Sequence, residues 1–197
     1  MRPTNVAGQF QFHAASDTNG IFSNFWAGAP VAIGGENWLT VEHYFQAQKF
    51  REVSTDSPSI KRRKNHVRDS IRDAAFPAAT KDLARDASQN SGLHFNISQW
   101  NQQRVGVMYE AVFAKFSQDE MLANALLNTN TAQLVETMPA YRDDRFWGVV
   151  GSGVFSGRAT GANMLGQILS QVRRDLSENR SCVSPVAVFD RNELQKW

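Results

Sequence analysis

The chain has 197 residues, a length that suits one domain with or without a short tail. Hydrophobic residues make up 42% of it, which is enough for a sizeable core, and the formal net charge of +2 excludes binding to nucleic acid or membrane through a high overall charge. Its single cysteine, Cys182, excludes an intramolecular disulfide framework and a metal site built from cysteines.

The histidines and the apolar runs narrow the class of protein further. No two histidines stand three or four residues apart, so we expect no metal site and no cofactor (His13, His43, His66 and His94). The N-terminus lacks the apolar region of a signal peptide, and no run of about 18 apolar residues follows. We therefore expect an intracellular, cytoplasmic protein without membrane association; a nuclear location stays open.

The first half of the chain contains strand signals followed by a helix signal. Residues 9–12 alternate in polarity like a short strand, and residues 31–39 read as a hairpin around the Gly34-Gly35 turn. Thr40 is a suitable N-cap for a helix over about 41–51. The charge-rich stretch 53–76 is expected to be a loop or a short irregular helix.

The second half is dominated by helix signals. Pro77 suits the first turn of a helix that ends near residue 87. Apolar residues at helical spacing predict an amphipathic helix over 105–116, and Ser117 to Glu120 reads as a capping box for the next helix. Residues 134–157 carry strand signals broken by glycines, and a final helix is expected over about 162–176.

These elements predict an α+β fold that is dominated by helices and has a small mixed or antiparallel sheet. We expect one domain over residues 1–176 and a polar C-terminal extension over 177–197.

The stretch from Thr40 to Phe50 is the most informative for chemistry. On a helix Glu42, Gln46 and Lys49 stand at i, i+4 and i+7, so that a carboxylate, an amide and an amine share one face beside aromatic residues. The alternative is a solvated salt-bridge stripe, which is the commoner meaning of Glu and Lys on one helical face.

Two further segments have a functional and a structural interpretation. Asp144, Trp147 and Gly148 follow a proline-containing turn, where a carboxylate can orient a ribose hydroxyl while the indole stacks on a base; a charged turn before a buried tryptophan is the alternative. The glycine-rich stretch 157–166, which includes Asn163, can seat a phosphate before a helix, although such glycines more often mark a turn.

A basic run forms the fourth candidate. Lys61 to Lys64, with Arg68 and Arg72, places six positive charges within twelve residues. Most runs of this kind are solvated surface, and contact with phosphate or nucleic acid is the alternative.

Ordered motifs over roughly residues 20–175 resemble the NADAR (YbiA-like) family. They are Phe22-Ser-Asn24-Phe25, Glu42-His-Tyr-Phe-Gln46 with Lys49-Phe50, the segment 79–85 ending in Arg85, Trp100 with Arg104 and Met108, Asp144-Arg-Phe-Trp147-Gly148, and Gly161-Ala-Asn163-Met-Leu-Gly166. Asn101 and Arg104 stand where the family pattern has Asp and Lys, and the lysine of segment 79–85 comes one place late.

The resemblance implies the YbiA-like α+β fold and an N-glycosidase that cleaves bonds to ribose. Because the sequence has no cluster of histidines or cysteines, we expect the reaction to be independent of metal. It implies that Glu42, Lys49, Trp100, Asp144 and Trp147 line the pocket. Members of the family are reported to hydrolyse ribosylamino-pyrimidine phosphates of riboflavin synthesis, and others remove ADP-ribose from guanine bases of nucleic acid.

We therefore expect three catalytic residues, Glu42, Lys49 and Asp144. The expected substrate-binding residues are Phe22, Asn24, Phe45, Gln46, Arg85, Trp100, Trp147, Gly148 and Asn163. Two carboxylates can divide the work of glycoside hydrolysis, with Glu42 activating water or stabilising the sugar cation and Asp144 orienting ribose or acting as acid. Alternatively, the Lys49 amine attacks C1′ and forms a Schiff base.

The basic run favours ADP-ribosylated guanine in nucleic acid as the substrate, with the riboflavin intermediates as the alternative. A non-catalytic reader of ADP-ribose or nucleotides, and a nucleic-acid-binding module that uses residues 61–72, are the competing classes.

Overall fold

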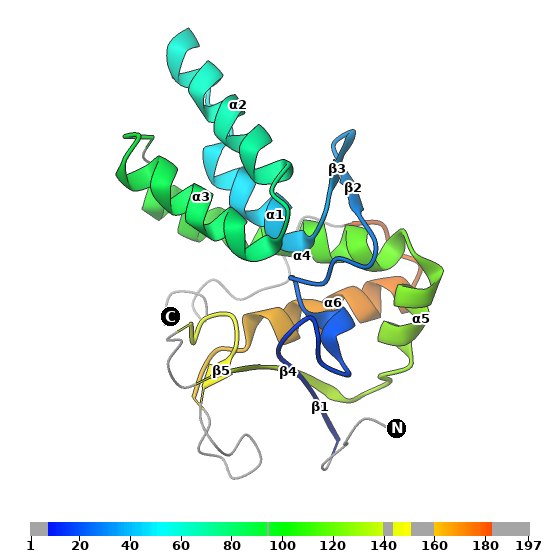
Figure 1. The fold of residues 1–197 in the computed structure, drawn as a ribbon. Coiled ribbons are helices and arrows are strands. Elements are labelled where there is room, and N and C mark those ends of the chain that lie inside the picture. The colour runs from blue at the N-terminus through cyan, green and yellow to red at the C-terminus, as the bar shows by residue number, and fades with distance from the viewer. Residues whose placement is uncertain (1–7, 94, 140–143, 151–159, 183–197) are drawn as a thin grey trace.

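The computed structural model describes residues 8–93, 95–139, 144–150 and 160–182 (Figure 1). Its elements follow in the order β1 (Gln9–Phe12), η1 (Gly20–Phe22), β2 (Val31–Ile33), β3 (Glu36–Trp38), α1 (Val41–Ala47), η2 (Gln48–Phe50), α2 (Pro58–Arg72), α3 (Pro77–Gln89), α4 (Ile97–Ser117), α5 (Glu120–Leu127), β4 (Gln133–Met138), β5 (Val149–Val150) and α6 (Met164–Ser177). The α+β, helix-dominated class predicted from the sequence is confirmed. No helix in the described parts of the chain has both the length and the apolar character needed to cross a membrane.

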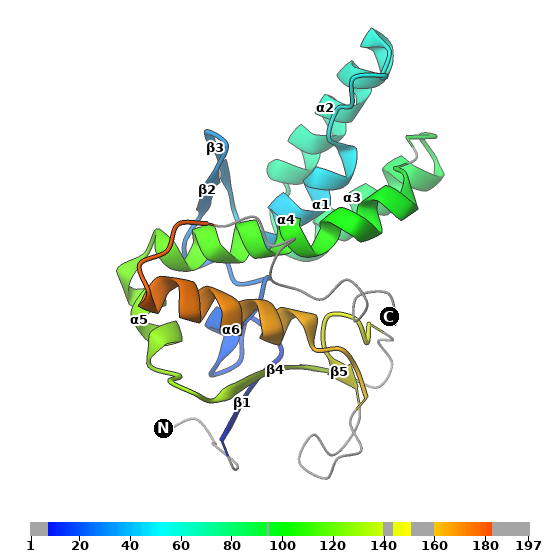
Figure 2. The ribbon, with the colours of Figure 1, turned by 180° about the vertical axis from the view of Figure 1, so that it is seen from behind.

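A small sheet in the order β1-β4-β5 forms the base of the molecule (Figures 1 and 2). Its strands are parallel, with Gln9 opposite Gln133 and Thr137 opposite Val149. Helix α6 lies along this sheet, α4 crosses above α6, and α1, α2 and α3 stand on the far side of α4. The antiparallel pairs are found in the β2-β3 hairpin and in a bridge from Val150 to Thr160, so the described sheet is mixed at its β5 edge.

Helix α1 begins where the sequence predicts. The Thr40 hydroxyl accepts a hydrogen bond from the backbone N–H of His43, as an N-cap does, and it also contacts the His43 ring at 2.8 Å. The other ring nitrogen of His43 lies 3.1 Å from the carbonyl oxygen of Ala74. Beyond Ala47 the helix tightens into the 3-10 turn η2. Every residue of α1 is buried, so this short helix runs through the core.

The stretch 53–76 is not a loop or a short irregular helix, because residues Pro58–Arg72 form the regular helix α2. Its start has clear local causes: Ser57 accepts a hydrogen bond from the N–H of Ile60, and Pro58 occupies the first turn. Ile71 is fully buried, and Ile60 and Val67 pack against the core at helical spacing. Because these three apolar residues are widely spaced among charged ones, the helical periodicity is weak in the sequence, and the stretch is predicted from its charge to be irregular.

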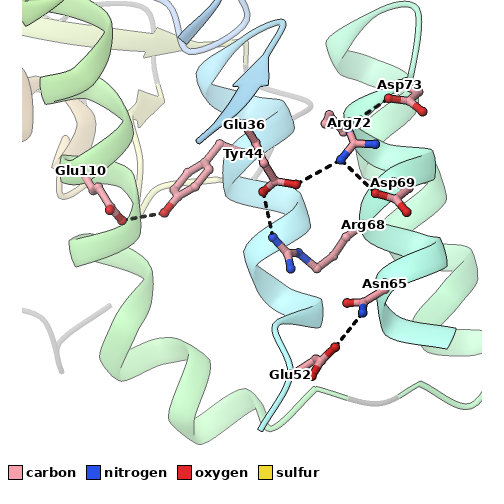
Figure 3. A network of polar contacts seen from close by, with 9 residues as sticks. All are labelled: Glu36, Tyr44, Glu52, Asn65, Arg68, Asp69, Arg72, Asp73 and Glu110. Atoms are coloured by element: carbon pink, nitrogen blue, oxygen red, sulfur yellow. Dashed lines mark hydrogen bonds and ion pairs between the residues drawn. The ribbon is translucent and has the colours of Figure 1, made fainter. Parts of the chain in front are cut away.

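Four of the six cations of the basic run form ion pairs within the described chain. Arg68 and Arg72 both reach Glu36 at the start of β3, at 3.3 and 3.0 Å (Figure 3). Lys64 is buried and contacts Asp56 at 2.7 Å, while Lys61 lies 3.9 Å from Glu52. These cations attach α2 to the hairpin and to the preceding segment.

Two helix starts differ from the prediction. Helix α4 begins at Ile97, well before residue 105, because Asn96 accepts a hydrogen bond from the N–H of Gln99 and caps it there. The cap of α5 is Asp119, whose carboxylate accepts from the N–H of Leu122, whereas Ser117 is the last residue of α4. The strand signals near 154–155 and most of the extension 177–197 fall on residues that the structure does not describe.

The start of α6 is fixed to β4 by one side chain. Asn163 adopts a left-handed backbone with φ of 51°, and its amide donates to the carbonyl oxygen of Leu134 and accepts from the N–H of Glu136, at 2.8 and 3.0 Å. Gly166 lies so close that an added Cβ would be 2.1 Å from the Leu134 oxygen. Close approach of α6 to the strand therefore needs Asn163 and Gly166 together.

We predict that Asn163→Ala lowers the free energy of unfolding by about 2–4 kcal/mol, because two backbone groups lose a partner and Ala is strained in this conformation. Urea denaturation measures the change. Asn163→Gly removes the same hydrogen bonds without the backbone strain and is expected to cost less. An Asn163→Ala protein as stable as the wild type would contradict the assignment.

Candidate active site

A pocket of about 930 Å³ opens between the helical layer and the sheet. Helices α1, α3 and α4 each present side chains from one face to the pocket. Strand β4 supplies Glu136 and Met138, and the segment before β5 supplies Asp144 and Trp147. The loop that follows η1 adds Asn24 and Phe25.

The centre of the pocket wall is a chain of polar contacts along α1. Glu42, only 2% exposed, accepts hydrogen bonds from the Asn24 amide on one oxygen and from the Gln46 amide on the other, the latter at 2.7 Å. The Gln46 carbonyl oxygen in turn accepts from the Lys49 amine at 2.7 Å. Lys81 of α3 lies 3.6 Å from the Glu42 carboxylate. The carboxylate and the Lys49 amine are thus connected through one amide.

Asn24 is held in position by Glu42 and, outside the pocket, by Lys115. Its carbonyl oxygen accepts from the backbone N–H of Glu42 at 3.0 Å, so Asn24 bonds Glu42 through both main chain and side chain. The Lys115 amine, 4% exposed, donates to the carbonyl oxygens of Ile21 and Ser23 at 2.6 and 2.9 Å. Burial lowers the pKa of Lys115 to about 7. This buried amine fixes the loop that aims Asn24.

Lys49 lies among aromatic rings. Its amine is 5.8, 5.6 and 5.7 Å from the ring centroids of Phe45, Phe95 and Trp100. Burial lowers the pKa of Lys49 below its ordinary value, Glu42 and Asp144 oppose this shift, and Lys81 adds to it. A lowered pKa increases the fraction of neutral, nucleophilic amine near neutral pH.

The aromatic wall is centred on Phe45. Its ring meets Trp100 at 5.0 Å and Trp147 edge-on at 5.3 Å. Trp147 also packs edge-on against Phe146, whose ring carries the Arg104 guanidinium 3.5 Å from its centroid. Flat apolar surfaces of this kind suit stacking with a base or packing against a sugar.

The structure brings nine of the twelve predicted site residues to this pocket: Glu42, Lys49, Asp144, Asn24, Phe45, Gln46, Arg85, Trp100 and Trp147. Arg85 is exposed and pairs with Asp82 at the rim.

Three predicted residues, Phe22, Gly148 and Asn163, are not among the described residues that line it. Phe22 stacks on Phe116 in the core at 5.9 Å. Gly148 allows β4 to approach closely, since an added Cβ would lie 2.7 Å from the Glu136 carbonyl oxygen, and Asn163 is occupied by the β4 backbone.

Lys81, Arg104 and Glu136 line the pocket and were not predicted as site residues. A sequence signal exists for two of them. Trp100, Arg104 and Met108 stand at i, i+4 and i+8 on α4, and Lys81 precedes Arg85 by one turn of α3. For Glu136 the sequence offers only a strand signal, because the burial of that strand depends on distant elements.

The basic run 61–72 contributes no residue to this pocket within the described chain, and residues 157–159 of the glycine-rich stretch lie outside the described residues. The proposed phosphate seat in that stretch therefore stays a prediction.

Comparisons with known proteins identify the family of the chain. A family model described as NADAR domain matches residues 11–177. The chain is 36% identical to N-glycosidase YbiA of Escherichia coli, over 84% of this chain and 87% of that protein, and 30% identical to an N-glycosidase of Nostoc punctiforme, over 91% and 97%. The riboflavin biosynthesis protein PYRR of Zea mays is 33% identical over 88% of this chain but only 25% of its own length.

Among solved structures, the NMR structure of Escherichia coli YbiA superposes with a TM-score of 0.66 at 31% identity and covers 90% of each chain. With a family model that spans residues 11–177 and relatives that align over nearly their whole length, the chain belongs to the NADAR domain family.

Proposed function

We propose that the chain hydrolyses the bond between C1′ of a ribose and the nitrogen of a base. The observation that carries this proposal is the buried Glu42 carboxylate, which is linked through Gln46 to the Lys49 amine beside an aromatic wall. Family membership makes the chain a hydrolase that acts on N-glycosyl compounds, the class to which its N-glycosidase relatives belong.

Loss of a base from ribose leaves positive charge on C1′ in the transition state. A carboxylate near C1′ stabilises that charge and can take a proton from an attacking water. Glu42 fits this role because two amides fix both of its oxygens, so the group is oriented before substrate arrives. Asp144 lines the same pocket, and we assign to it the orientation of the ribose hydroxyls.

Lys49 offers a covalent alternative. Its amine, desolvated among three rings, can attack C1′ and displace the base, and the resulting ribosyl-lysine opens to a Schiff base that water hydrolyses. In that route the Gln46 amide connects the nucleophile to Glu42, which moves the protons.

Two substrate classes are supported by different observations. The names of relatives such as PYRR favour ribosylamino-pyrimidine phosphates of riboflavin synthesis. The pocket volume of about 930 Å³, together with cations at Lys81, Arg85 and Arg104, favours a larger substrate such as ADP-ribosylated guanine. The basic run does not support a nucleic-acid substrate, because within the described chain it contributes no residue to the pocket. Incubation with each compound, followed by mass spectrometry of the released base, distinguishes them.

We predict that Glu42→Gln lowers kcat by about 10²–10⁴-fold, because the amide keeps the shape of the side chain but cannot accept a proton. Steady-state kinetics on whichever ribosylated compound the wild type cleaves measures this, with a thermal melt to verify folding. The matched control is Glu120→Gln on the exposed first turn of α5. A Glu42→Gln rate within a few-fold of the wild type would make Glu42 a structural residue.

We predict that Lys49→Arg is nearly inactive if Lys49 is the nucleophile, because a guanidinium with a pKa above about 12 stays protonated. Borohydride added during turnover should then attach the ribosyl group to the wild-type peptide that contains Lys49, as seen by mass spectrometry. Substantial activity of Lys49→Arg without a trapped adduct would exclude the covalent route and leave water attack directed by Glu42.

A further inference from the structure

The pocket contains a buried acidic group that the mechanism above does not use. Glu136 is the fourth residue of β4 and is only 5% exposed, yet its side chain lines the pocket. Its backbone N–H is fixed by Asn163, and Gly148 packs against its carbonyl oxygen. The strand that carries Glu136 is thus held from two sides.

Among the described residues, one oxygen of the Glu136 carboxyl group lacks the partner that a buried charge requires. Within the described chain, its Oε2 atom is buried and has no hydrogen-bond partner. The Glu42 carboxylate, in contrast, accepts from two amides. A buried carboxylate without donors is costly, whereas a protonated carboxyl can give its hydrogen to a ligand.

The surroundings favour the protonated form. Burial raises the pKa of Glu136 to about 8, Asp144 adds to the rise, Lys81 lowers it and Glu42 raises it. The other charged or titratable side chains that line the pocket are His13, Lys49, Arg85 and Arg104. At neutral pH the protonated, neutral form of Glu136 therefore predominates.

We propose that Glu136 is a further catalytic residue, the acid that gives its proton to the departing base. The assignment rests on the proposed N-glycosidase function and moves the role of acid from Asp144 to Glu136. As the C1′–N bond breaks, its electron pair goes to the base, the base takes the proton, and Glu136 becomes a carboxylate. Water adds its oxygen to C1′ and gives a proton to Glu42.

Transfer of that proton from Glu42 to Glu136 through solvent restores both groups, so one water is consumed for each bond broken. A base displaced by Lys49 needs the same proton, and the assignment therefore holds for either route. The two carboxyl groups divide the work because amides donate to both oxygens of Glu42, whereas the buried Oε2 atom of Glu136 has no donor within the described chain.

The test is the pH dependence of kcat for the wild type, Glu136→Gln and Glu120→Gln, on ribosylamino-pyrimidine phosphate and on ADP-ribosylated guanine. Because the protonated acid is the active form, the wild-type rate should be steady below the pKa and fall as the pH rises through about 8. Glu136→Gln cannot release a proton, so its kcat should be lower by about 10²-fold or more, with little change in KM and without the alkaline fall. Glu120→Gln should follow the wild type.

A Glu136→Gln rate within a few-fold of the wild type, or a residual rate that still falls near pH 8, would overturn the assignment. If Glu136→Gln does not fold, the wild type alone decides, since a kcat that stays flat between about pH 7 and about pH 10 excludes Glu136 as the acid. If the wild type releases base from neither compound, the proposed function itself is refuted. If the wild type is active and Glu136→Gln is equally active, only the assignment of Glu136 is refuted.

Discussion

The complete burial of α1 is the constraint on which the site depends. All seven residues of this helix are buried, so the polar side chains of Glu42 and Gln46 cannot be satisfied by bulk water. They are satisfied by each other, by Asn24 and by Lys49. The hydrogen bonds that make burial of a carboxylate tolerable are therefore the same ones that fix its direction toward the pocket.

A second buried polar group, the Lys115 amine, supports Glu42 from a distance. Lys115 extends from α4 to two carbonyl oxygens of the loop that contains Asn24, and Asn24 in turn bonds Glu42 through its main chain and its side chain. Orientation of the carboxylate thus draws on α4, the loop and α1 together. Because the Glu42 carboxylate is already oriented in the free protein, substrate binding does not have to supply the free energy of ordering it.

What the sequence predicted well was local. The row Glu42, Gln46 and Lys49 follows from helical spacing alone, and the observed contacts join these three residues. The features that escaped prediction depend on partners far along the chain. Helix α2 is tied to Glu36, the amide of Asn163 is used by β4, and the environment of Glu136 is set by α1, α3 and Asp144. Local patterns give the position of such side chains but not the groups that surround them.

The parallel pairing of β1 with β4 has a consequence for how the chain acquires its shape. Gln9 pairs with Gln133, and the pocket is lined by residues from His13 to Leu165. Contacts between such distant parts of a chain form slowly and late. During synthesis α1 emerges early with its carboxylate, but the floor beneath it is made only when β4 and α6 have left the ribosome. Completion of the pocket is thereby tied to the synthesis of β4 and α6, and a nascent chain that stops before β4 carries Glu42 on α1 without the strand that closes the site.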